Sequence, residues 1–143
     1  MSDRRPGKER TMDPKIESVQ AVYEAFGRGD VAAILDQVTE DVDWASEPES
    51  NIAPWHGIHH GKAELPHFFA ALGESVDVTE FTPLAFASSD TDVMVVIHFG
   101  MTVRSNGNAG AMDLHHWWRF AGDKICWYRG TEDTALTARL LAG

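Results

Sequence analysis

The chain has 143 residues, a formal net charge of -10 at pH 7, 43% hydrophobic residues and 24% charged residues. These values fit one globular domain with its own core. The acidic balance argues against nucleic acid as a partner, which requires a basic surface, and against anionic membranes. The single cysteine, Cys126, excludes an internal disulfide, and no apolar run approaches the ~20 residues of a membrane span.

The first twelve residues are polar and carry four basic side chains, without the apolar segment of a signal peptide. We expect a disordered leader over residues 1–12 and a single domain over residues 13–143. We also expect a cytoplasmic protein.

Three helices are predicted in the first half of the domain. Asp13 and Pro14 form a typical N-cap and first helical residue, and Gly27 and Gly29 end the first helix. Its apolar residues recur at helical spacing: Ile16, Val19, Val22, Tyr23 and Phe26. A shorter helix follows Asp30, and a third covers about residues 62–72.

Strands dominate the rest of the chain. Alternating or β-branched runs predict strands over residues 42–46, 76–87, 92–104, 111–121 and 124–131. Residues 47–61 form a long loop that contains His56, His59 and His60, and loops of this length are often lids or binding loops. Helices segregated from a mostly antiparallel sheet make an α+β domain.

The last two strands form a hairpin over residues 112–133 that is rich in functional side chains. Strand alternation divides it into two faces. One face carries His116, Trp118, Tyr128 and Glu132, and the other carries Trp117, Trp127 and Arg129. Trp117 and Trp127 on an outer face predict a buried dimer interface.

The order and spacing of several short segments resemble the nuclear transport factor 2-like superfamily, in its SnoaL-like and ketosteroid-isomerase-like branch. The segments are YEAFGRGD at residues 23–30, DVDW at 41–44, GIHHG at 57–61 and HWWRF at 116–120. The resemblance implies a cone in which three N-terminal helices pack on a curved, mostly antiparallel sheet around a pocket. It also implies dimerisation through the outer sheet face.

Carried over residue by residue, the resemblance places His116 where the isomerases hold an oxyanion-hole aspartic acid. Tyr128 and Glu132 fall at pocket-lining positions, and Trp44 and Ser46 face inward from the first strand. The first helix departs from the isomerase pattern. Val22 occupies the position of the family's helix tyrosine, and Tyr23 lies about 100° further round the helix, so we do not expect Tyr23 to substitute.

The general base of the isomerases aligns near Ser46, and the nearest acid is Glu47, beside Pro48. Steroid isomerisation itself is therefore not expected. We predict an aromatic pocket of Trp44, Trp118 and Tyr128 for a small apolar or aromatic molecule, with His56 over its mouth. His59 and His60 are adjacent, which is poor spacing for one metal ion, so no metal site is expected.

The leading hypothesis is a homodimer that carries out cofactor-free acid–base chemistry, such as isomerisation, cyclisation or hydration. His116 would be the acid, base or oxyanion donor, because imidazole titrates near neutral pH. Glu132 or Asp133 would orient it, and Glu47 would be a second carboxylate. The alternative is a ligand-binding or dimerisation module without catalysis, in which His116 is a hydrogen-bonded pocket residue only.

Overall fold

The computed structural model describes residues 13–48 and 51–143. It begins with helix α2 (Pro14–Arg28), which Asp13 caps by accepting a hydrogen bond from the Lys15 backbone N–H at 2.8 Å. Gly29, in the left-handed region at φ 70°, ends the helix. Helices α3 (Val31–Leu35) and α4 (Gly61–Ser75) follow. The leader predicted at residues 1–12 lies outside the described residues.

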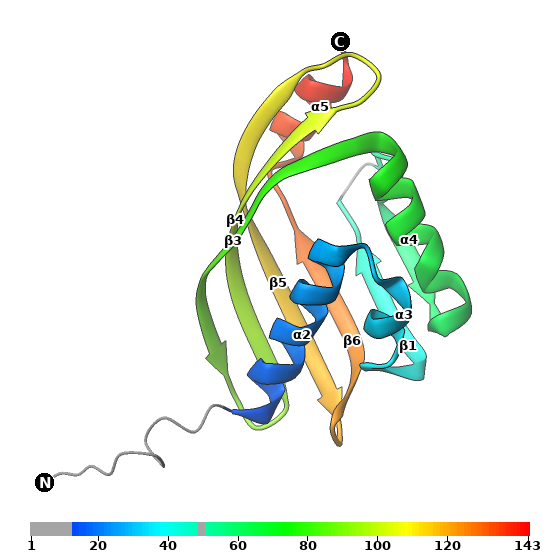
Figure 1. Cartoon of the computed structure of the whole chain (residues 1–143), viewed down its shortest axis with the longest axis vertical. Helices are drawn as coiled ribbons and strands as arrows, with labels where there is room; N and C mark the ends of the chain where they lie inside the picture. Colours follow the sequence, from blue (N-terminus) through cyan, green and yellow to red (C-terminus); the bar gives the residue numbers. More distant parts are fainter. Residues whose placement is uncertain (1–12, 49–50) are drawn as a thin grey trace, which may run out of the picture.

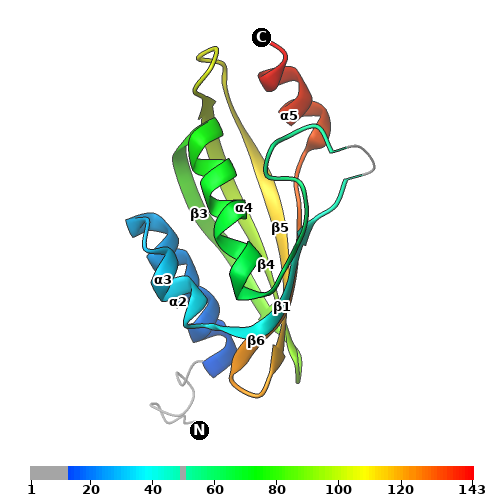
Figure 2. The ribbon, with the colours of Figure 1, turned by 90° about the vertical axis from the view of Figure 1, so that its right-hand side faces the viewer.

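Six strands form one sheet in the order β2-β1-β6-β5-β4-β3. Their bounds are β1 Val38–Ser46, β2 Gly57–His60, β3 Val76–Ser88, β4 Asp92–Val103, β5 Ala109–Ala121 and β6 Lys124–Thr131. Only β1 and β6 pair in parallel. Helices α2, α3 and α4 cover one face of the curved sheet, and α5 (Thr134–Leu141) lies at one end (Figures 1 and 2). The predicted α+β class and cone are confirmed.

Three details differ from the sequence prediction. Strand β2 forms within the predicted loop, because residues 57–60 pair with β1, where His59 opposes Trp44. Strand β1 begins at Val38 rather than at residue 42, because the second helix ends at Leu35. Helix α5 was not predicted and makes four helices in all among the described residues.

The core lies between the helices and the covered face of the sheet. Strand β4 buries alternate residues from Val93 to Met101, and α2 adds Val19, Val22 and Ala25. These two elements also line the cavity described below, which fixes the position of its wall. No helix among the described residues is long and apolar enough to cross a membrane.

Candidate functional site

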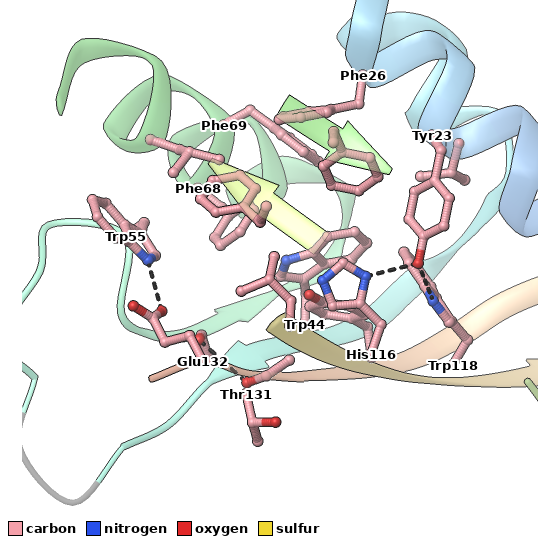
Figure 3. Close-up of a pocket in the computed structure, with 18 of the residues that line it drawn as sticks. Tyr23, Phe26, Trp44, Trp55, Phe68, Phe69, His116, Trp118, Thr131 and Glu132 are labelled. Carbon is pink, nitrogen blue, oxygen red and sulfur yellow. Dashed lines mark hydrogen bonds between the residues drawn. The ribbon is translucent and has the colours of Figure 1, made fainter. Parts of the chain in front are cut away.

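A cavity of about 90 Å³ lies between the helices and the sheet (Figure 3). Aromatic side chains form most of its wall: Tyr23, Phe26, Trp44, Trp55, Phe68, Phe69, Phe81, Phe99, Trp118 and Tyr128. They come from helices α2 and α4, from five strands and from the loop before β2. Among them lie a few polar side chains, chiefly His116 and Glu132. The arrangement is typical of a site for a small, largely apolar ligand.

His116 belongs to a hydrogen-bonded row with two other side chains. Trp118 Nε1 donates to Tyr23 Oη at 3.3 Å, and Tyr23 Oη lies 2.7 Å from His116 Nδ1 (Figure 3). The Tyr23 oxygen accepts from Trp118, because an indole nitrogen can only donate, and His116 Nδ1 is the only acceptor among the described residues for the proton of Tyr23. This network assigns the His116 proton to Nε2.

The environment keeps His116 uncharged. Burial, helped by the nearby His115, lowers the pKa of His116 from 6.5 to about 3. Its Nε2 has no hydrogen-bond partner among the described residues and is not fully enclosed, so the N–H is open to the cavity that His116 lines. His116 thus offers a neutral hydrogen-bond donor to a ligand, in a fixed tautomer.

Tyr128 lies beside His116 on the neighbouring strand. Its ring centroid is 4.1 Å from that of Trp44 and 5.2 Å from that of His116. Its hydroxyl has no partner among the described residues and is not fully enclosed. Burial, followed by Tyr23 and Glu132, raises the pKa of Tyr128 well above its usual value, so the phenol keeps its proton.

Glu132 holds together one end of the cavity. Its Oε1 accepts from Trp55 Nε1 at 3.1 Å and from His56 Nε2 at 3.0 Å, and its Oε2 accepts from the Thr137 hydroxyl. His56 Nδ1 accepts from two backbone N–H groups of its own loop, so Nε2 carries the proton. The carboxylate therefore links the loop before β2 to helix α5.

Most predicted site residues converge on this cavity. Those that line it are His116, Glu132, Trp44, Ser46, Trp118 and Tyr128. His56 does not line it, because the side chain is buried and turned toward Glu132. Asp133 caps α5 by accepting from Leu136 N at 3.0 Å. Glu47 is 46% exposed, and its carboxylate lies 3.5 Å from Arg129 Nε.

Two interpretations of the sequence were wrong. The group at His116 Nδ1 is the Tyr23 hydroxyl, and neither Glu132 nor Asp133 orients the imidazole. Tyr23, which was set aside as pointing the wrong way round its helix, reaches the pocket. Trp55 and Thr137 were missed as partners of Glu132. The loop position of Trp55 beside His56 was the only signal for it, and Thr137 had none.

The opposite face of the sheet carries a second aromatic group. The rings of Trp117 and Trp127 lie 4.7 Å apart, and the Arg129 guanidinium lies 4.5 Å from the Trp127 centroid. Trp117 Nε1 donates to Asp92 at 2.6 Å. Burial acts to raise the pKa of Asp92, but hydrogen bonds from Arg119 and Trp117 lower it to about 2. This outer face matches the one predicted by strand alternation.

No cluster of three or more His, Cys, Asp or Glu side chains in residues 13–48 and 51–143 could hold a metal ion. The polar groups in the cavity wall are hydroxyls, indole N–H groups, one imidazole and one carboxylate.

A family model of the SnoaL-like domain matches residues 19–128, which is most of the chain. The chain belongs to the SnoaL-like family. The match includes β1, α4 and the β5–β6 hairpin up to Tyr128, and therefore most of the cavity wall. No functionally curated protein matches the sequence.

Solved structures give the same fold. An NTF2-like protein of unknown function from Burkholderia pseudomallei is 25% identical, with a TM-score of 0.85 over 92% of this chain and all of its own. TerC, crystallised with polyporic acid, is 22% identical, with a TM-score of 0.83 over 92% of this chain and all of TerC. A candidate polyketide cyclase from Xanthomonas campestris is 18% identical, with a TM-score of 0.77 over 90% of this chain and 96% of its own.

Proposed function

We propose that this SnoaL-like protein binds a small, largely apolar carbonyl compound in its cone and polarises the carbonyl oxygen through His116. The observation that carries the proposal is the row from Trp118 through Tyr23 to His116, which leaves an uncharged Nε2–H open to the cavity. A neutral donor in a dry, aromatic wall stabilises negative charge that develops on a ligand oxygen.

The size of the cavity limits the ligand. Its volume of about 90 Å³ is of the same order as the roughly 150 Å³ of an engineered cavity that takes up benzene in another protein. This cavity is the smaller of the two, so a ligand of one or two rings fits only if side chains of the wall move. The aromatic rings around it favour a flat molecule.

Glu132 supplies the base in this proposal. Gly130 pairs with His116 across the hairpin, and Glu132 follows two residues later. His116 and Glu132 both line the cavity, so a ligand bound there would lie near the imidazole and the carboxylate. Glu132 would remove a proton next to the carbonyl while His116 stabilises the enolate, as in an isomerase or cyclase. The candidate polyketide cyclase from Xanthomonas campestris shares this fold, and cyclisation is one reaction of this class.

The second candidate is a binding module without catalysis. It is favoured by one observation: Glu132 already accepts hydrogen bonds from Trp55, His56 and Thr137. A carboxylate that already accepts from three donors has fewer lone pairs free to take a proton from a ligand.

Exchange of deuterium into the α-carbon of a panel of enolisable ketones separates the two candidates. The catalytic proposal expects exchange that His116→Phe and Glu132→Gln each reduce by at least about tenfold. Glu47→Gln is the matched control, because that carboxylate is exposed and lies outside the cavity wall. Ketone binding without exchange supports the module instead. Failure of every ketone to bind refutes the ligand class.

We also infer a homodimer through the outer sheet face. Trp117, which is 38% exposed, and Trp127 would form the centre of the interface. Stacked arginines on these rings are typical of interface cores.

A further inference from the structure

Tyr128 and Gly130 form an arrangement that the reaction proposed above does not use. Both residues lie on the inner face of β6, two positions apart, so the Tyr128 side chain leans along the strand over Gly130. A Cβ atom at residue 130 would collide with the Tyr128 hydroxyl and with its ring. Only glycine at this position lets the hydroxyl lie there.

The position of that hydroxyl brings it next to His116. Gly130 is the cross-strand partner of His116, so an atom that lies over Gly130 is a neighbour of the imidazole. The rings of His116 and Tyr128 meet at 5.2 Å in a T-shaped arrangement with an interplanar angle of 74°. The ring of Trp44 stacks on Tyr128 from the other side, which restrains the phenol in this orientation.

The Tyr128 hydroxyl is also available to a ligand. The tyrosine is only 5% exposed, yet its oxygen has no partner among the described residues and is not fully enclosed. Tyr23 contrasts with it, because its hydroxyl already accepts from Trp118 and donates to His116. A buried hydroxyl that opens on a cavity without a protein partner is completed by a ligand or by water.

We propose that the Tyr128 hydroxyl is a second hydrogen-bond donor to the same ligand oxygen that His116 binds, and that Gly130, which lacks a side chain, makes room for it. A carbonyl oxygen has two lone pairs and accepts from both donors at once. Two donors favour an oxygen that carries negative charge, so the preferred ligands are enols, enolates and strongly polarised ketones rather than simple apolar molecules. The inference rests on the proposed function, because it assumes that His116 binds the ligand.

The probes are indanone and indane, which share a ring system and differ in the carbonyl. Binding of each is measured by calorimetry, and the carbonyl stretching frequency of bound indanone is measured by infrared difference spectroscopy. Tyr128→Phe removes only the hydroxyl. It is expected to weaken indanone binding about tenfold, to leave indane binding unchanged, and to move the carbonyl stretch part of the way back to its value in an apolar solvent. Gly130→Ala should act in the same direction.

The infrared result separates this inference from the proposed function. If Tyr128→Phe leaves the frequency unchanged while His116→Phe raises it, the second donor is refuted and the role of His116 stands. If Tyr128→Phe raises it while His116→Phe does not, the hydroxyl binds the ligand alone, and both the shared oxygen and the proposed role of His116 are refuted. An equal loss of indane and indanone binding in Tyr128→Phe would mean that the tyrosine only shapes the cavity, which also overturns the proposal.

Discussion

Replacing Tyr23 by phenylalanine tests the hydrogen-bonded row on which the site depends. The variant keeps the ring, which packs at 5.0 Å from Phe81 and 5.9 Å from Trp118, and removes only the hydroxyl. Two groups then lose their partner, Trp118 Nε1 and His116 Nδ1. Without the phenol, nothing among the described residues fixes the tautomer of His116.

The expected loss of stability follows from those two groups. Leaving a buried donor or acceptor unsatisfied costs about 1–3 kcal/mol. Trp118 is 1% exposed, so its N–H has no access to bulk water and bears the full penalty. His116 faces the cavity, where water can replace part of the lost bond. We therefore expect the free energy of unfolding to fall by about 2–4 kcal/mol in total.

Urea unfolding followed by tryptophan fluorescence measures this change, and Tyr128→Phe is the matched control. Both tyrosines are largely buried in the same cavity wall, but the Tyr128 hydroxyl has no partner among the described residues. Tyr128→Phe should change stability by less than about 0.5 kcal/mol. Equal effects of the two variants, or a loss below about 0.5 kcal/mol for Tyr23→Phe with an unchanged m-value, would refute the row.

Three further predictions concern other parts of the molecule. The pKa of His116 is about 3 in the folded protein and 6.5 when unfolded, so the unfolded chain binds more protons between pH 3 and pH 6.5. The free energy of unfolding should therefore fall as pH drops from 6.5 toward 3. His116→Phe should flatten that slope in urea unfolding. Glu132→Gln should lower the unfolding free energy by about 2 kcal/mol, since an amide cannot accept from three donors as well; an unchanged melting temperature would contradict this. Trp117→Glu should yield monomers in sedimentation velocity, and a persistent dimer would exclude the outer-face interface.

Strand alternation predicted the two faces of the β5–β6 hairpin because it depends only on local geometry. Trp118 and Tyr128 are buried and Trp117 is exposed, as a period of two requires. Helix α5 was not predicted, because it depends on distant contacts and not on local geometry. It is short, and contacts from far along the chain hold it, including Asn106 and Asn108 side chains that donate to the Leu140 carbonyl.

The error over Tyr23 has a geometric cause. A rotation of about 100° per residue gives the direction of the Cα–Cβ bond around a fixed helix axis, and not the position of the end of a long side chain. A phenol places its oxygen well beyond its Cβ, and tertiary packing sets how the helix lies against the sheet. In the folded protein Tyr23 packs among Phe81, Phe86 and Trp118, which turn its hydroxyl toward His116. A sequence gives the angle between two positions but not the rotation of the helix.

The hydrogen-bond partners of His116 and Glu132 could not be predicted for the same reason, because tertiary packing brings them together. A carboxylate for His116 was sought near it on the hairpin, yet Glu132 pairs with His56, which is 76 positions away. The outcome changes the chemistry that the site supports. A histidine paired with a carboxylate would be a stronger base, whereas His116 paired with a phenol remains a neutral donor. In the proposed function, the donor and base roles therefore fall to different groups, with His116 as the donor and Glu132 as the only carboxylate among the described residues that line the cavity. A ligand between them would meet a hydrogen-bond donor at its carbonyl oxygen and a base at the adjacent carbon, which are the two groups that enolisation requires.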